Sequence, residues 1–270
     1  MAGGRVRPAG NLLLRRPARH IPLFLMSAAR RCLFCRRGDG GFVSSEHIFP
    51  ETIANADLAM LPPGVVCDRC NNGPLAALDQ TLCAYLPIAM RRAVLGMTNK
   101  AGKRTTLRFA QGRVEPMPKE EVAPGDSHGV RIVDSGPRPT LVRDLSDGDE
   151  VWLRLEGQGG RRLTPRFFSE LSRSILKIGF ELAFLDHDHT LLEHRFDGVR
   201  DVILGVRDHS GEVALALPGD LNDVRLRGSY MLDESSGLGG VAISILGVQL
   251  VTHAAGQELV PTPGFFIGRF

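Results

Sequence analysis

Two pairs of cysteines are the part of this sequence best suited to chemistry. Cys32 pairs with Cys35 and Cys67 with Cys70, each across a two-residue gap. Such a gap lets both thiolates of one turn reach the same ion, so two pairs predict a single tetrahedral zinc site. The alternative is disulfide bonds, which stabilise small secreted proteins. With 270 residues, 43% of them hydrophobic, this chain can bury a core without such bridges, and we predict zinc.

A carboxylate and an imidazole lie next to each other between the two cysteine pairs. Glu46 and His47 belong to the segment Ser-Ser-Glu-His-Ile-Phe-Pro at 44–50, and Asn71 follows the last cysteine. A zinc ion bound to all four cysteines would close the chain around this pair, which indicates chemistry as well as structure. The alternative for His47 is a solvent-exposed or core histidine.

These elements, in this order, resemble the zinc-containing HNH endonucleases, which are nucleases of the ββα-metal type. The resemblance is carried by Cys-x-x-Cys at 32–35, Glu-His-Ile-Phe-Pro at 46–50 and Cys-x-x-Cys-Asn at 67–71. It covers about residues 30–82. In that family a hairpin presents the acid-histidine pair, a helix follows the second cysteine pair, and the cysteines hold a structural zinc.

The resemblance also implies a role for each polar residue. His47 matches the general base that takes a proton from water. Glu46 and Asn71 match the ligands of a second, catalytic divalent ion, Mg²⁺ or Mn²⁺. Phosphodiester cleavage builds negative charge that a cation stabilises, and histidine, with an unperturbed pKa of about 6.5, can accept a proton near neutral pH. Asn71 has an alternative role as a helix N-cap.

The chain departs from the family pattern at two places. Residues 61–66 contain no asparagine, where the family often has one, and the acid is Glu46 rather than the commoner aspartate. We expect a backbone carbonyl to orient the His47 ring instead, and the longer Glu46 side chain to hold the metal slightly further away.

Residues 74–98 are predicted to form a helix that extends this module, with a break or kink at Pro87. Asp79 is expected on a solvated face of that helix, with a place at the metal centre as the alternative. Cys83 lies in an apolar stretch and is expected to be a buried core thiol. The leucines that recur at helical spacing are Leu75, Leu78, Leu82 and Leu86.

A longer helix is predicted at 165–186, followed by a second one at about 196–204. Arg173 and Lys177 lie off the apolar stripe of the first helix. We expect them on a solvated face, and the alternative is that they face the nuclease module or nucleic acid. Residues 186–194, rich in histidines and acids, are predicted to be a polar turn rather than a metal site. The stripe consists of Phe168, Leu171, Ile175, Ile178, Leu182 and Leu185.

The helix pair, with Lys177 and Phe-Asp-Gly-Val-Arg at 196–200, is similar to what often follows the zinc-type HNH module. Alternating residues predict the surrounding strands, and Gly237 to Gly240 is predicted to be a flexible connection. The strands are expected at 103–115, 129–134, 151–155, 212–217, 224–232 and 241–252.

The predicted fold class is α+β, with a ββα-metal zinc-bound HNH module followed by an α+β domain of antiparallel strands and two helices. Residues 1–27 are expected to be a basic, disordered leader, with a true start at Met26 as the alternative. Residues 28–98 form the HNH-like module and residues 99–270 a C-terminal domain of unknown role.

The expected function is metal-dependent hydrolysis of phosphodiester bonds in nucleic acid, with DNA as the expected substrate. The alternative is a zinc-containing module that binds nucleic acid without cutting it. A net charge of +3 is mild for a nucleic-acid binder. No apolar stretch is long enough to span a bilayer, and a zinc-thiolate site directly follows the short apolar run at 21–29, so we expect a cytoplasmic protein. A protein partner or homo-oligomer through residues 99–270 is a further expectation.

Overall fold

A computed structural model places the parts of the chain on which the following sections rest. The predicted leader at 1–27 and the predicted strand at 151–155 lie outside these described residues. The structure describes residues 31–53, 60–99, 101–103, 105, 107–109, 112–116, 130–134, 165–209, 213–216, 225–233, 237–253 and 266–268.

The second cysteine pair opens a run of helices. α1 (Asp68–Cys70) passes through a π-helical turn at Asn71–Leu75 into α2 (Ala76–Ala84), and α3 (Leu86–Val94) follows. Tyr85 between α2 and α3 has an extended backbone with ψ 123°. Pro87 has no N–H with which to continue the hydrogen bonds of α2, and a proline fits the first turn of a new helix. The break predicted near Pro87 is thus confirmed, one residue before α3 begins.

Two antiparallel sheets follow in the chain. The smaller contains β1 (Leu107–Phe109), β2 (Gly112–Pro116) and β3 (Val130–Asp134), paired in that order. The strand region predicted at 103–115 holds β1 and most of β2, which pair with each other, Phe109 opposite Gly112.

The larger sheet has the order β5-β6-β7-β4-β8. Its strands correct two expectations. The strand predicted at 241–252 is a hairpin that turns at Leu246 and Gly247, which both have positive φ, as two-residue hairpin turns require. The flexible connection predicted at Gly237 to Gly240 is the beginning of β6. The strands are β4 (Val213–Ala216), β5 (Arg227–Asp233), β6 (Gly237–Ile245), β7 (Val248–His253) and β8 (Phe266–Gly268).

Both predicted C-terminal helices are present, as α5 (Pro165–His187) and α6 (Asp197–Leu204), joined by 3₁₀ turns at Asp188–Leu192 and His194–Phe196. The predicted apolar stripe of α5 is buried except at its end, where Leu185 is 37% exposed. α5 lies very close to β6, since a Cβ on Gly179 would come within 2.3 Å of the Val241 side chain.

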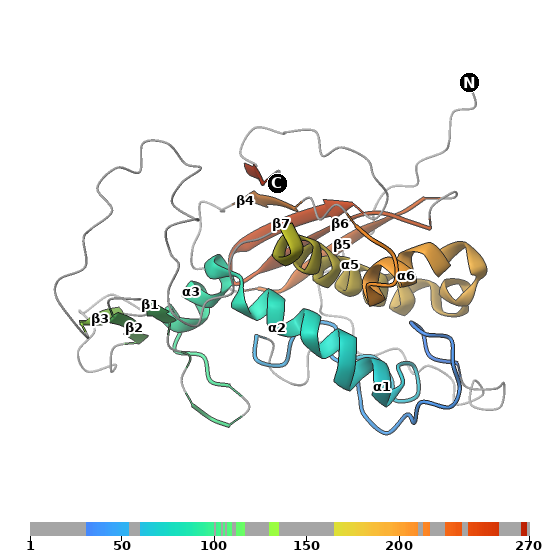
Figure 1. Ribbon diagram of the computed structural model, residues 1–270, viewed down its shortest axis with the longest axis horizontal. Coiled ribbons are helices and arrows are strands. Elements are labelled where there is room, and N and C mark those ends of the chain that lie inside the picture. Colours follow the sequence, from blue (N-terminus) through green and yellow to red (C-terminus); the bar gives the residue numbers. More distant parts are fainter. Residues whose placement is uncertain are drawn as a thin grey trace.

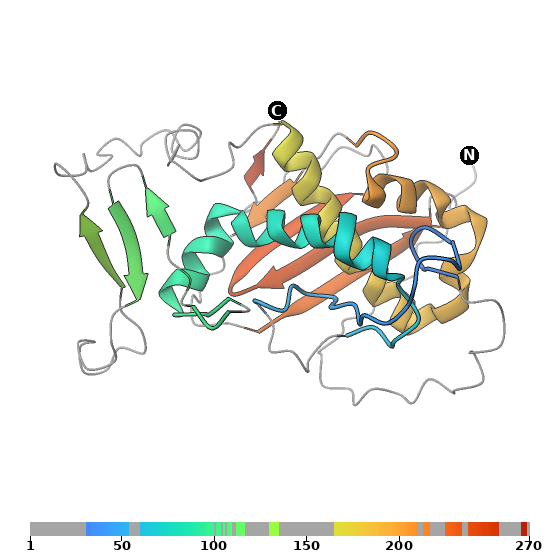
Figure 2. The same ribbon diagram turned by 60° about the horizontal axis from the view of Figure 1, so that its bottom comes forward.

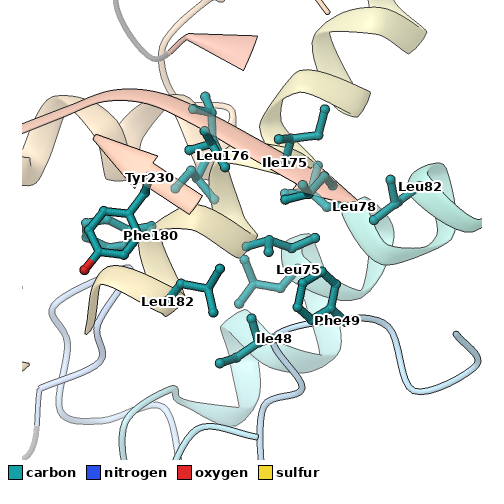
Figure 3. Packing of buried hydrophobic residues seen from close by; sticks show 14 of the residues in the cluster. Ile48, Phe49, Leu75, Leu78, Leu82, Ile175, Leu176, Phe180, Leu182 and Tyr230 are labelled. Carbon is teal, nitrogen blue, oxygen red and sulfur yellow. The ribbon is translucent and has the colours of Figure 1, made fainter. Parts of the chain in front are cut away.

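The elements form three layers, with α5 between the five-stranded sheet and α2 (Figures 1 and 2). The cysteine-bearing segment lies on the α2 side, next to α6, and the small sheet lies beyond α3 (Figure 2). Figure 3 shows Ile48, Phe49 and Leu78 packed with Ile175 and Leu176 of α5. One hydrophobic core therefore connects the segment at 32–94 with the C-terminal helices and sheet.

The mixture of helices and antiparallel strands agrees with the predicted α+β class. Over the described ranges, we find no helix with the length and apolar character that spanning a membrane requires.

Candidate functional site

The four paired cysteines come together in space. Cys32, Cys35, Cys67 and Cys70 are free thiols, and their Sγ atoms all lie within 4.8 Å of one another. Within the part of the chain that the structure describes, they are the only group of three or more His, Cys, Asp or Glu side chains arranged to hold a metal ion. Four sulfur ligands in this arrangement suit zinc.

Local backbone geometry brings each pair into place. At the first pair a tight turn forms, where Arg36 N donates to Cys32 O at 2.9 Å and Arg36 adopts a positive φ of 59°. At the second pair α1 begins, so Cys67 and Cys70 lie one helical turn apart on the same face. Leu33 N donates to Val65 O at 2.9 Å and ties the two turns together.

The clustered thiols favour binding of a cation. A hydrogen bond with Cys70, helped by backbone N–H groups, lowers the pKa of Cys32 to about 5. Burial raises the pKa of Cys35 to about 11, and the hydrogen bond with Cys32 raises the pKa of Cys70 far above its usual value. Ionisation is therefore favoured at Cys32 and disfavoured at Cys35 and Cys70. A divalent cation is needed before these thiols can ionise together.

The loop before the acid-histidine pair is fixed to the start of α1. Asp68 accepts hydrogen bonds from Val43 N at 3.0 Å and from Ser44 N at 2.7 Å. The Asn71 amide nitrogen donates to Ser44 Oγ at 3.1 Å and to Ser45 O at 3.0 Å. Since a backbone carbonyl can only accept, the Asn71 NH₂ group must face this loop. Asn71 therefore holds the loop rather than capping a helix.

Glu46 and His47 lie on an extended segment that pairs with residues 60 and 61. His47 forms a β-bridge with Met60, and Leu61 N donates to Glu46 O at 2.9 Å. The two residues have different surroundings, because Glu46 is buried while His47 is partly exposed. This single bridge and hydrogen bond hold the segment in an extended conformation.

A lysine from α5 reaches this segment. Lys177 is 0% exposed, and its Nζ lies 2.6 Å from Glu46 Oε1, 3.2 Å from Asp79 Oδ1 and 3.4 Å from Glu181 Oε2. The same Nζ donates to His47 O at 2.7 Å. The solvated face expected for Lys177 is therefore wrong, and so is the solvated face expected for Asp79, which is ion-paired to it.

Burial and the surrounding charges set the ionisation of this cluster. Burial alone would lower the pKa of Lys177, but Asp79, Glu181 and Glu46 raise it above its usual value, so the ammonium group stays charged. Burial raises the pKa of Glu46 against the attraction of Lys177. Burial raises the pKa of Glu181 much further. Lys177 is thus a permanent cation whose closest counter-ion is Glu46.

Glu46, which the HNH resemblance assigns to a catalytic cation, is already paired with another positive charge. An ammonium group already lies against Glu46 Oε1, and Glu46 Oε2 is buried without a hydrogen-bond partner. The Asn71 NH₂ group is engaged with the loop at 44–45, which leaves only its carbonyl oxygen as a possible ligand. Two positive charges this close to one carboxylate would repel each other strongly in a buried setting.

A second buried cation joins the C-terminal helices to the first cysteine turn. Arg200 of α6 is 2% exposed. Its Nε donates to Leu33 O at 2.8 Å, between Cys32 and Cys35, and its guanidinium also pairs with Asp197 at 2.5 Å. Asp197 in turn accepts from Arg36 at 3.0 Å.

Sequence reasoning noticed Lys177 and the segment at 196–200 but gave them no part in the site. A clue was available, because the family resemblance places Lys177 and the segment at 196–200 after the cysteine module. Long charged side chains are rarely buried unless paired, so partners in that module were the feature to look for. The polar turn predicted at 186–194 is confirmed in outline, as α5 continues to His187 and 3₁₀ turns follow. Cys83, expected to be buried, is partly buried, with Sγ 3.3 Å from Thr52 Oγ1.

Comparisons of this chain with protein-family models, with curated proteins and with solved structures found no match.

Proposed function

We propose that this chain is an HNH-type endonuclease that hydrolyses phosphodiester bonds in nucleic acid, with DNA as the expected substrate and zinc as the structural metal of the four cysteines. His47 is the proposed general base. The observation that carries the proposal is that the partly exposed His47 side chain stands on a backbone held from both sides. Leu61 N bonds the preceding carbonyl and Lys177 bonds the carbonyl of His47 itself.

A fixed but reachable imidazole is what proton removal from water requires, because a base must hold its position relative to the attacked phosphate. The chemistry assigned to His47 is to accept the proton of a water molecule as that water attacks phosphorus. The phosphorus–oxygen bond to the leaving sugar oxygen breaks, and that oxygen takes a proton from solvent. Nothing in this step needs Glu46 to leave its ion pair. A catalytic Mg²⁺ or Mn²⁺, if used, would stabilise the charge that develops on the phosphate oxygens.

A second candidate is a zinc module that binds nucleic acid without cutting it. The ion pair of Glu46 with Lys177 favours this candidate, because it occupies the carboxylate that the family resemblance assigns to the catalytic cation.

Cleavage of supercoiled plasmid tests the two candidates. Zinc-loaded wild type, His47→Ala and His187→Ala are incubated with Mg²⁺ or Mn²⁺, and binding to labelled DNA is followed in parallel. His187 is exposed at the end of α5 and serves as the matched control. We expect His47→Ala to lower the rate by about 100-fold or more, as loss of a general base does, with zinc content and DNA binding unchanged.

The outcomes separate the candidates. Binding without cleavage by the wild type selects the non-cutting module. Cleavage at equal rates by wild type and His47→Ala removes His47 from the mechanism, and absence of both binding and cleavage on DNA and RNA rejects both candidates.

A further inference from the structure

We propose that Lys177 is a positioning residue for His47, and that the Glu46 carboxylate is the counter-ion of Lys177 rather than a ligand of a catalytic cation. This inference rests on the proposed role of His47 as a base. It assigns α5, a helix outside the family-like segment, to the working part of the site.

The geometry of the ammonium group carries the inference. A lysine has three N–H donors, and Lys177 directs them at the acid-histidine segment and its surroundings. It lies 2.6 Å from Glu46 Oε1, 2.7 Å from His47 O and 3.2 Å from Asp79 Oδ1. One atom thus bonds the side chain of one residue in the pair and the main chain of the next, which fixes the direction in which His47 leaves the backbone.

The position of Lys177 is itself tightly set. It lies on the same helix as Ile175 and Leu176, which are packed in the core (Figure 3). Its own side chain is 0% exposed. A buried ammonium group with three acceptors has little freedom to move, because every displacement leaves a buried charge with fewer partners. The core of α5 is therefore coupled to the placement of His47.

The same geometry explains why Glu46 is buried. A carboxylate that binds a catalytic cation must remain open to the substrate phosphate that shares this cation. Glu46 is 3% exposed, and one of its oxygens lies against Lys177. Its arrangement suits an anchor that holds the extended segment down on α5.

A set of matched variants tests the inference. Glu46→Gln keeps an oxygen that can accept from Lys177. Lys177→Met removes the donor, and the double variant Glu46→Gln/Lys177→Met also removes the carboxylate that would be left without a cation. Arg173→Met is the control, because Arg173 precedes Lys177 by one turn of α5 and donates to Ile203 O, not to the His47 segment.

Four quantities are measured for each variant. They are single-turnover cleavage, zinc content, Mn²⁺ binding by electron paramagnetic resonance, and the ¹H–¹⁵N signals of the His47 ring. The ring signals are assigned by their loss in His47→Ala. They report the position of the imidazole without any cleavage.

The inference predicts a distinct pattern. Glu46→Gln should keep the cleavage rate within about fivefold of wild type, since the hydrogen bond survives, and should leave Mn²⁺ binding unchanged. Lys177→Met should lower the single-turnover rate at saturating enzyme by about 100-fold, as misplacement of a reacting group does. The half-saturating enzyme concentration should stay nearly unchanged, and the His47 ring signals should move. The double variant should recover folded, zinc-loaded protein relative to Lys177→Met but stay slow. Arg173→Met should behave as wild type in cleavage and in the ring signals.

Two results would overturn the inference. One is loss of both Mn²⁺ binding and cleavage in Glu46→Gln, which would make Glu46 a metal ligand. The other is a double variant that folds but keeps the His47 ring signals and rate of wild type. If the wild type cleaves no nucleic acid, the proposed function fails, while ring signals that move in Lys177→Met but not in Arg173→Met still uphold the positioning of His47.

Discussion

Replacing Arg200 by methionine tests whether α6 and the first cysteine turn are one structural unit. The buried guanidinium donates to Leu33 O at 2.8 Å and to Glu193 O at 3.2 Å. It also donates to Leu191 O and pairs with Asp197 at 2.5 Å. Methionine retains much of the apolar stem of arginine but supplies no donor, so the substitution removes these bonds with little change in volume.

The expected cost follows from the acceptors that remain. The carbonyls of Leu33 and Leu191 lie at the buried end of the guanidinium. A buried acceptor left without a partner costs about 1–3 kcal/mol, so the two together cost about 2–6 kcal/mol. The pair with Asp197 adds less than about 1 kcal/mol, because Asp197 is 39% exposed and keeps Arg36 as a partner. We expect Arg200→Met to lower the free energy of unfolding by about 4 kcal/mol.

Urea unfolding at a fixed free zinc concentration measures this change, since bound metal contributes to the apparent stability. Arg36→Met is the control, because Arg36 pairs with the same Asp197 from a more exposed position, with its side chain 23% exposed. Its loss should cost less than about 1 kcal/mol. Arg200→Met should also release zinc faster to a chelator, because Leu33 lies between Cys32 and Cys35, two of the proposed zinc ligands. An Arg200→Met protein within 1 kcal/mol of wild type, or equal costs for the two variants, would refute the reasoning.

Three further predictions concern the zinc cluster, the core and the buried acids. Cys67→Ser should lose zinc and folded structure together by metal analysis and circular dichroism, whereas Cys83→Ser keeps both; full zinc content in Cys67→Ser would contradict the site. Ile175→Asp should unfold the protein, at a cost of several kcal/mol for a buried charge, whereas Leu185→Asp on the same helix, 37% exposed, should stay folded. Burial raises the pKa of Glu181 above its ordinary 4.5, so the folded chain keeps a proton that the unfolded chain loses above about pH 4.5, and stability falls as pH rises. Glu181→Gln should match the wild-type Tm near pH 4 and exceed it increasingly as the pH rises above 4.5, and a constant difference would be evidence against a raised pKa at Glu181.

The features that followed from sequence depend on local spacing. The cysteine cluster comes from two short gaps, because a turn or one helical turn brings both thiols of a pair together. The buried stripe of α5 comes from apolar residues at helical spacing, and the break before α3 comes from the constraint that Pro87 places on its neighbours. In each case the residues that decide the structure lie within one or two turns of each other.

The features that sequence reasoning missed depend on distant partners. Lys177 is a charged residue outside the apolar stripe of α5. When α5 is considered alone, this position predicts a side chain exposed to solvent. Its acceptor on His47 is 130 positions away in the chain, and no periodicity reveals such a partner. The hairpin of β6 and β7 was missed for another reason. Alternation continues through Ile245 and Val248, so only the positive φ at Leu246 and Gly247 separates the two strands.

The buried side chains of Lys177 and Arg200 contribute more to the geometry of the cysteine-bearing segment than to stability. Moving an ammonium or guanidinium group out of water costs several kcal/mol, which its partners only partly offset. A methionine or leucine in a repacked core would serve stability as well. Lys177 and Arg200 differ from such residues because each bonds a backbone carbonyl of the cysteine-bearing segment, that of His47 and that of Leu33. An apolar contact tolerates sliding, whereas these bonds allow one register of α5 and α6 against the four cysteines and His47. The two cations therefore fix the placement of the segment, as the proposed hydrolytic function requires.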